Sequence, residues 1–245
     1  MAAVIALAVV LGITFWPSRS SDSKKWWLGP PAAWGQEILT ALDAITGVTC
    51  REQTVLVESD GSEHLSSTWD IFYVSRDSYR RDIYDGGVLR EIQWYVPDGA
   101  GTLQHSVRFD LGSYFSHTGE GSFGNYDPVE RMRFKVRLLD NADKLLGEEI
   151  VDGRECVGFE ISASKYGNNP EQWTDCIWFD VETKLPVRIE QRGRSFTGQS
   201  ETTRTTIQDQ FDYNPDLPAD TFVPKTPEGF IYGHPDDIQA ARKKQ

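Results

Sequence analysis

Residues that could do chemistry are present, but their spacing does not fit the common catalytic patterns. The run Gly119 to Gly124 has the letters GxGxxG. Such a run binds a dinucleotide only when it follows a strand and opens the helix of a βαβ unit. Here the glycines fall between a series of short strands and a helix that begins with proline. We interpret the run as a mobile loop and expect no cofactor.

The histidines and carboxylates do not form a catalytic or metal-binding motif. The four histidines are His64, His105, His117 and His234. No HExxH or His-x-His pair occurs, so a metal site is not indicated. His105 lies in an apolar, strand-like segment, which favours a hydrogen-bonded core histidine over a general base. Asp70, Asp82 and Asp180 suit turns and solvent-facing positions, and no GxSxG is present. The sequence therefore favours a protein that is not an enzyme.

The cysteines predict buried thiols. Three are present, Cys50, Cys156 and Cys176, so they cannot all pair within one chain. In a hairpin, Cys156 would face a residue near 181 and Cys176 one near 161. At about 3.3 Å per residue this offset is roughly 15 Å, beyond the reach of a disulfide. No CxxC occurs, so redox and zinc sites have no support.

Composition indicates one folded domain with an acidic surface. The chain has 245 residues, of which 39% are hydrophobic and 25% charged, enough for one sizeable core. The net charge of −12 opposes binding to nucleic acid or to an anionic lipid surface, since both require basic side chains.

The N-terminal segment is apolar and suits a membrane. Residues 2–16 contain no charge and span roughly 23 Å as a helix, with Trp16 as an interfacial anchor. We predict a membrane anchor over 1–16 and a linker over 17–30. The alternative is a cleaved signal peptide, although the basic start and the small-x-small site are missing.

The next part of the chain predicts a helix and then an antiparallel meander. Trp34, Ile38 and Leu42 have helical spacing, which predicts an amphipathic helix over 31–45. Strands are then expected at 49–59, 66–74, 79–84, 88–96 and 102–111, separated by turn sequences such as Asp85-Gly86-Gly87. Short connections of this kind join antiparallel neighbours.

The segment 130–139 is ambiguous. Its basic residues stand at every second position, which suits a strand, but Asp127, Pro128 and Glu130 offer an N-cap, a first-turn proline and a capping box. We predict a helix over 128–139. The basic residues would then spread around its axis and stay solvated: Arg131, Arg133, Lys135 and Arg137.

The last third of the chain predicts further strands with one apolar face each. Val157, Phe159 and Ile161 alternate with other residues, as do Leu185, Val187 and Ile189. Proline-rich segments at 211–218 and 222–230 close the domain, because proline cannot enter a central strand. Residues 231–245 form a polar tail.

Several of these motifs carry a family resemblance. They are Leu146-Gly147-Glu148 with Asp152 to Phe159, Trp178-Phe179-Asp180 with Leu185 to Arg188, and Pro227 to Phe230. Residues 31–230 thereby resemble the LolA-like superfamily of bacterial envelope proteins, which includes lipoprotein carriers and stress-sensor domains. The resemblance implies an α+β fold, in which a curved antiparallel half-barrel sheet holds helices in its concave face. In this chain the N-terminal membrane helix would precede it.

The resemblance also implies an apolar cavity between helices and sheet. The predicted lining is Trp69, Ile71, Tyr73, Ile92, Trp94, Val107, Phe159, Ile177, Phe179, Val187 and Ile189. Trp94 and Phe159 share their parity with apolar strand neighbours, so we expect both to point inward. A ligand would gain about 0.8 kcal/mol for each buried CH₂. The alternative is that these side chains simply pack on the helices as core.

The functional expectation is a membrane-tethered, periplasmic domain without catalysis. It would bind a lipid, a lipoprotein acyl chain or another apolar group. The alternative is an envelope-sensing interaction domain, similar to stress regulators, with an envelope protein as partner. Arg19, Lys24 and Lys25 would keep the downstream side in the cytoplasm by the positive-inside rule. The resemblance implies the opposite orientation, which we follow.

Overall fold

The computed structural model describes residues 31–58, 60–74, 78–99, 101–119, 127–167, 173–197 and 200–233. The predicted anchor and linker, most of the GxGxxG run and residues 234–245 lie outside the described residues. Among the described helices, none is long and apolar enough to cross a bilayer.

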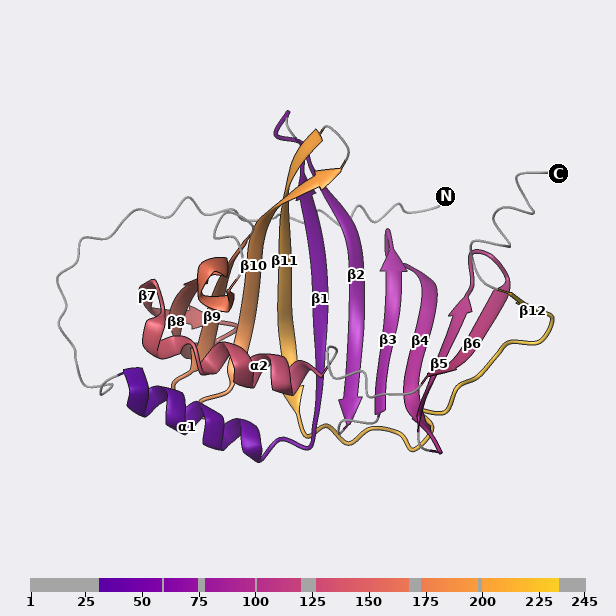
Figure 1. The fold of residues 1–245 in the computed structure, drawn as a ribbon, viewed down its shortest axis with the longest axis horizontal. Helices are drawn as coiled ribbons and strands as arrows, with labels where there is room; N and C mark the ends of the chain where they lie inside the picture. Colours follow the sequence, from indigo (N-terminus) through magenta and orange to yellow (C-terminus); the bar gives the residue numbers. More distant parts are fainter. Residues whose placement is uncertain are drawn as a thin grey trace, which may run out of the picture.

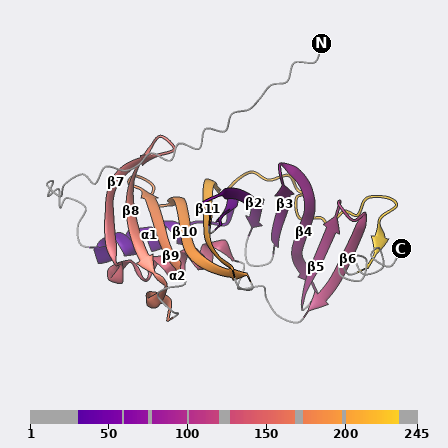
Figure 2. The same cartoon turned by 90° about the horizontal axis from the view of Figure 1, so that it is seen from above.

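The described strands form one open, curved sheet (Figures 1 and 2). The strands are β1 (Gly47–Val57), β2 (Glu63–Val74), β3 (Ser78–Asp85), β4 (Val88–Asp98), β5 (Gly101–Arg108), β6 (Ser113–Gly119), β7 (Lys144–Val151), β8 (Arg154–Ser162), β9 (Trp173–Asp180), β10 (Pro186–Thr197), β11 (Ser200–Tyr213) and β12 (Ile231–Tyr232). Their order is β12-β6-β5-β4-β3-β2-β1-β11-β10-β9-β8-β7. Neighbouring strands in this order are antiparallel except for β12 with β6, which are parallel. The predicted antiparallel meander is confirmed, while β6 was not expected as a separate strand.

The two predicted helices are present. They are α1 (Pro31–Asp43) and α2 (Pro128–Val136), and short 3-10 turns follow at η3 (Leu139–Asn141) and η4 (Ala163–Tyr166). The Asp127 carboxylate accepts hydrogen bonds from the backbone N–H groups of Val129 and Glu130, at 2.9 and 3.0 Å. This N-cap, with proline in the first turn, sets the start of α2 as the sequence predicted.

The main core lies between the helices and one face of the sheet, here called the helix face. Its buried members come from both helices and from β1–β4 and β8–β11, and include Trp34, Ile38, Leu42, Val48, Ile71, Tyr95, Met132, Phe159, Ile177, Phe179, Ile189 and Phe211. The predicted α+β architecture is therefore confirmed for the described residues.

A second, smaller cluster lies on the opposite face of β7–β10. It contains Val151, Cys156, Cys176, Trp178 and Val187. Gly158 is needed here, because a Cβ at this position would lie 2.9 Å from Nε1 of Trp178. All three cysteines are free and buried, as predicted. Cys156 pairs with Asp180 and Cys176 with Glu160, one residue from the expected register.

The C-terminal segment 214–230, here called the strap, covers part of the opposite face. In Figure 1 it runs in yellow from the end of β11 past β2–β4 to β12 at the far edge of the sheet. Trp94 Nε1 and Arg80 Nη1 donate to the carbonyl oxygen of Thr221, at 3.2 and 3.3 Å. The strap thus covers the half of the sheet that lies away from the two helices, and it does so on the opposite face.

Candidate functional site

The helix face brings together most of the predicted cavity residues. Side chains of directly paired residues share a face of an antiparallel sheet. The residues that join the main core are Trp69, Ile71, Tyr73, Phe159, Ile177, Phe179 and Ile189. Phe159 and Phe179 meet edge to face, with ring centroids 6.0 Å apart. The sequence therefore located a real apolar surface on β2 and β8–β10.

This surface is covered by the helices in the structure. Trp34, Ile38 and Leu42 of α1 belong to the same buried cluster, as do Val129 and Met132 of α2. Phe179 is fully buried. An apolar ligand at this surface would therefore have to take the place of a helix.

The other predicted residues lie elsewhere. Trp94 points away from the side of its neighbour Tyr95, because successive side chains of a strand alternate between the two faces. Ile92 lies two residues before Trp94 and shares its face, as does Val107, which pairs with Ile92. Val187 belongs to the second cluster. The expectation that Trp94 points into the same hollow as Phe159 is wrong. Period-two alternation predicts which residues of a strand share a face, but it does not predict which other element packs on that face.

His105 is a buried, hydrogen-bonded histidine, as the sequence predicted. Its Nδ1 lies 2.6 Å from Ser116 Oγ, and its Nε2 lies 3.0 Å from Thr226 Oγ1. The ring lies between those of Trp94 and Tyr114, at 5.6 and 5.9 Å. Burial lowers the pKa of His105 below its ordinary value. The residue joins β5, β6 and the strap.

A buried ion pair attaches α2 to the sheet. Lys135 Nζ lies 2.7 Å from Asp175 Oδ2, and Asp175 is 1% exposed. Asp175 also accepts from Tyr166 OH at 2.6 Å and from Gln191 Nε2 at 3.1 Å. Burial lowers the pKa of Lys135, against the opposing effect of Asp175. The prediction that Arg131, Arg133, Lys135 and Arg137 all stay solvated is therefore wrong for Lys135.

The sequence contains a pattern that indicates this ion pair, although it was not among the predictions above. Asp175 has the same parity as Ile177 and Phe179 on β9, so it points toward the apolar side of the strand. A carboxylate on a buried face requires a cation or several donors. Lys135 supplies the charge from the neighbouring layer.

By contrast, α1 is attached by apolar packing and by polar contacts near the surface. Arg133 of α2 contacts Asp43 Oδ1 at 3.2 Å and donates to the carbonyl oxygen of Leu42 at 3.1 Å. Lys184 lies 3.3 Å from Glu37 Oε2 and 3.8 Å from the ring centre of Trp34. Surface ion pairs of this kind contribute about 0–1 kcal/mol each. Of the two helices, α1 is the more weakly fixed.

The helix face of β3–β5 carries a polar row. Arg81 Nε donates to Gln93 Oε1 at 2.6 Å, and Tyr95 OH donates to the same oxygen at 3.0 Å. Ser106 Oγ donates to Glu91 Oε1 at 2.6 Å. On β3–β5 the helix face is thus partly polar, in contrast to β8–β10.

Comparisons with known proteins gave similar solved structures. No family model matches the chain, and no curated protein matches it. A DUF1329 family protein from Desulfovibrio piger is 12% identical, with a TM-score of 0.34 over 79% of this chain and 97% of that one. A LolA superfamily protein from Nitrosomonas europaea is 14% identical, with a TM-score of 0.32 over 78% and 97%. The MucA/MucB complex of Pseudomonas aeruginosa is 17% identical, with a TM-score of 0.40 over 80% of this chain and 61% of that one.

The names of these solved structures include the superfamily that the sequence motifs resemble. LolA superfamily proteins and MucB are among the structural neighbours of this chain. Their TM-scores lie below 0.5, so they assign no activity, ligand or partner to it.

Proposed function

We propose that the chain is a non-catalytic binding domain on the extracytoplasmic side of a membrane. It takes up a lipid, a lipoprotein acyl chain or another apolar group between α1 and the helix face of the sheet. The observation that supports this proposal is the difference between the two helices. An apolar sheet surface is covered in part by a helix whose described polar contacts beyond its own residues, at Glu37, Leu42 and Asp43, include no buried ion pair of the kind that Lys135 and Asp175 give α2.

Ligand uptake would exchange one apolar cover for another. Displacing α1 would uncover apolar side chains such as Ile177, Phe179 and Ile189, and an acyl chain would bury them again. Each CH₂ of that chain contributes about 0.8 kcal/mol. Because Lys135 and Asp175 hold α2 in place, the rest of the fold would be kept during the exchange.

Membrane attachment through residues 1–16 is a separate part of the proposal. It rests on the uncharged segment 2–16 and on Trp16. The full chain should stay in the membrane fraction after a carbonate wash. A soluble mature protein that begins after residue 20 would contradict the tether while leaving the binding proposal open.

The decisive experiment measures apolar ligands directly. Native mass spectrometry of the purified protein, before and after lipid extraction, should show a bound apolar species. The extracted protein should then take up a fluorescent fatty-acid probe. Arg133→Ala removes the contacts with Asp43 and Leu42 and should speed uptake several-fold, whereas Arg137→Ala, which changes an exposed arginine just after α2, should behave as the native chain.

The alternative is an envelope-sensing interaction domain. It is supported by the polar row on β3–β5, which suits contact with a protein more than with a lipid. If no apolar species copurifies and the extracted protein does not bind the fatty-acid probe, the helix face is packed core. The interaction domain then becomes the better proposal.

A further inference from the structure

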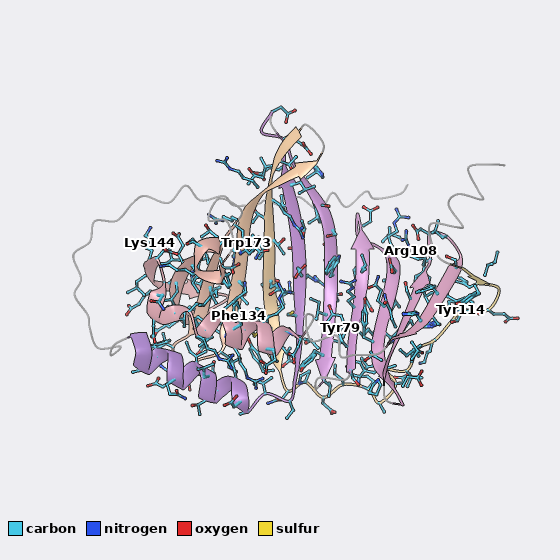
Figure 3. All side chains as sticks on the ribbon, viewed as in Figure 1. Tyr79, Arg108, Tyr114, Phe134, Lys144 and Trp173 are labelled. Atoms are coloured by element: carbon cyan, nitrogen blue, oxygen red, sulfur yellow. The ribbon has the colours of Figure 1, made fainter. Side chains whose placement is uncertain are left out.

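The two edges of the sheet are protected in different ways. At one edge, β7 has a bulge between Leu145 and Gly147, and Gly147 has a φ of +97°. Charged side chains also lie along it at Lys144, Glu148 and Glu149. Bulges and charges of this kind prevent another strand from pairing with an edge. Figure 3 shows Lys144 at this edge and Tyr114 toward the other.

At the other edge, a short piece of the chain itself occupies β6. Ile231 N donates to the carbonyl oxygen of Gly112 and Gly233 N to that of Tyr114, both at 3.0 Å. These bonds make β12 a parallel strand of two residues. Ile231 and Tyr232 remain 67% and 60% exposed, so this pairing buries little apolar surface.

The rest of the β6 edge lacks the protections seen on β7. Its register with β5 is unbroken from Thr102↔Gly119 to Arg108↔Ser113, and the strand contains no proline, lysine or acidic residue. The outward carbonyls of Gly112 and Tyr114 imply, by strand alternation, that the backbone groups of Ser116 and Thr118 also point outward. Among the described residues, no strand pairs with that side of β6 at positions 116–119.

We propose that the β6 edge is a docking site for an extended segment of a partner protein, which adds as a parallel strand in place of β12. Main-chain hydrogen bonds to an exposed edge supply affinity in this mode, and pockets for alternate side chains supply specificity. The proposal is independent of the apolar-ligand site on the helix face.

The contacts of β12 indicate which partner segment fits. Tyr232 packs edge to face on Tyr114 with ring centroids 5.4 Å apart, and Phe230 does the same on Phe109 at 5.8 Å. Tyr232 OH also donates to the carbonyl oxygen of Ser116, at 3.4 Å. The site therefore takes an extended segment with aromatic residues at alternate positions. Because the chain carries a net charge of −12, the segment should be uncharged or basic.

The strap can stay in place while β12 leaves. Thr221 and Thr226 hold the strap through Arg80, Trp94 and His105, upstream of β12. Releasing β12 therefore requires the loss of the few backbone hydrogen bonds of a two-residue strand and of exposed side-chain contacts. β12 acts as a weak internal competitor for the edge.

The test removes β12 pairing and offers a peptide in its place. Ile231→Pro deletes the N–H that binds Gly112, while Ile231→Ala keeps it and serves as the control. The probe is a fluorescent synthetic peptide with the sequence of residues 227–233, PEGFIYG. It should bind full-length Ile231→Pro about tenfold more tightly than Ile231→Ala, because the internal competitor is gone. Hydrogen exchange at Tyr114 and Ser116 should slow when the peptide binds.

A second variant checks that binding uses the β6 edge. Ser116→Pro, with Ser116→Ala as the control that keeps the N–H, removes an outward N–H within reach of the peptide and leaves the ladder to β5 intact, as circular dichroism should verify. In the Ile231→Pro background it should abolish peptide binding. The proposal is overturned if the peptide binds Ile231→Pro no better than Ile231→Ala, or if Ser116→Pro has no more effect than Ser116→Ala. Dimerisation of Ile231→Pro through β6 would overturn the partner protein in favour of a second copy.

Discussion

The two halves of the sheet receive their covers, the helices and the strap, on opposite faces. On β8–β10 the helix face is apolar and receives α1 and α2, through residues such as Ile177 and Phe179. On β4–β6 the opposite face is buried, and the strap covers Trp94 and His105. One continuous sheet can therefore have two covers on two sides, and an apolar strand pattern alone does not say which cover it meets.

The covers also differ in chemistry. The helices meet the sheet through a large apolar cluster with one deeply buried ion pair, Lys135 with Asp175. The strap meets it through hydrogen bonds with Arg80, Trp94 and His105. The apolar cover suits exchange for a lipid, and the hydrogen-bonded cover suits a fixed support for β12.

The largest expected effects come from truncating one core residue in each half. Trp94→Ala and Phe179→Ala should each lower the free energy of unfolding by about 3–5 kcal/mol, because both side chains are buried. Urea denaturation measures this loss. Fatty-acid probe uptake, measured on the folded fraction, should change in Phe179→Ala alone. Equal loss of uptake in Trp94→Ala would show that the halves are not independent.

Breaking the buried ion pair should have the next largest effect. Lys135→Met leaves the Asp175 carboxylate buried without its cation, which should cost about 3 kcal/mol of unfolding free energy. The double variant Lys135→Met/Asp175→Asn should recover part of this loss, because the uncharged amide can still accept from Tyr166. No recovery in urea denaturation would mean that the pair contributes through packing rather than charge.

Removing the N-cap of α2 should have a smaller effect. Asp127→Ala loses two backbone bonds and the 2.8 Å bond from Tyr73 OH, which should cost about 1–2 kcal/mol. The exposed Asp140 provides a control, and Asp140→Ala should stay within about 0.5 kcal/mol of the native chain. If Asp127→Ala also speeds probe uptake more than Arg133→Ala does, α2 and not α1 is the helix that moves.

The smallest expected effect is a pH dependence in the strap half. Because burial lowers the pKa of His105, the unfolded chain binds a proton near the ordinary value of 6.5, while the folded chain does so only at lower pH. Stability should therefore fall as pH decreases below about 6.5. His105→Gln should show less of this fall when urea curves at pH 7.5 and 5.5 are compared. The same slope in both proteins would assign the effect to other groups.

Local signals predicted much of this fold. Turn sequences and period-two alternation located β1–β5 and β8–β10, and the Asp127-Pro128 pair located α2. The hydrogen-bonded environment of His105 and the free cysteines also followed from their immediate neighbours. These features depend on a few adjacent residues, so one sequence is enough to find them.

The features that were missed depend on distant partners. The face of Trp94 is set by Thr221, and the burial of Lys135 by Asp175. The pairing of β12 with β6 joins segments more than a hundred residues apart. Each sequence pattern was compatible with two arrangements, and only the tertiary fold chooses between them.

The pairing of β1 with β11, here called the central seam, affects the order in which the sheet can form. Neighbouring strands pair within two meanders, β1–β6 and β7–β11, but the meanders join where Val48 pairs with Tyr213. Such a distant pairing closes a long loop, which slows folding. During synthesis each meander can form as it emerges from the ribosome, whereas the seam must wait for β11. The sheet therefore becomes continuous only after nearly all of the described chain has been made.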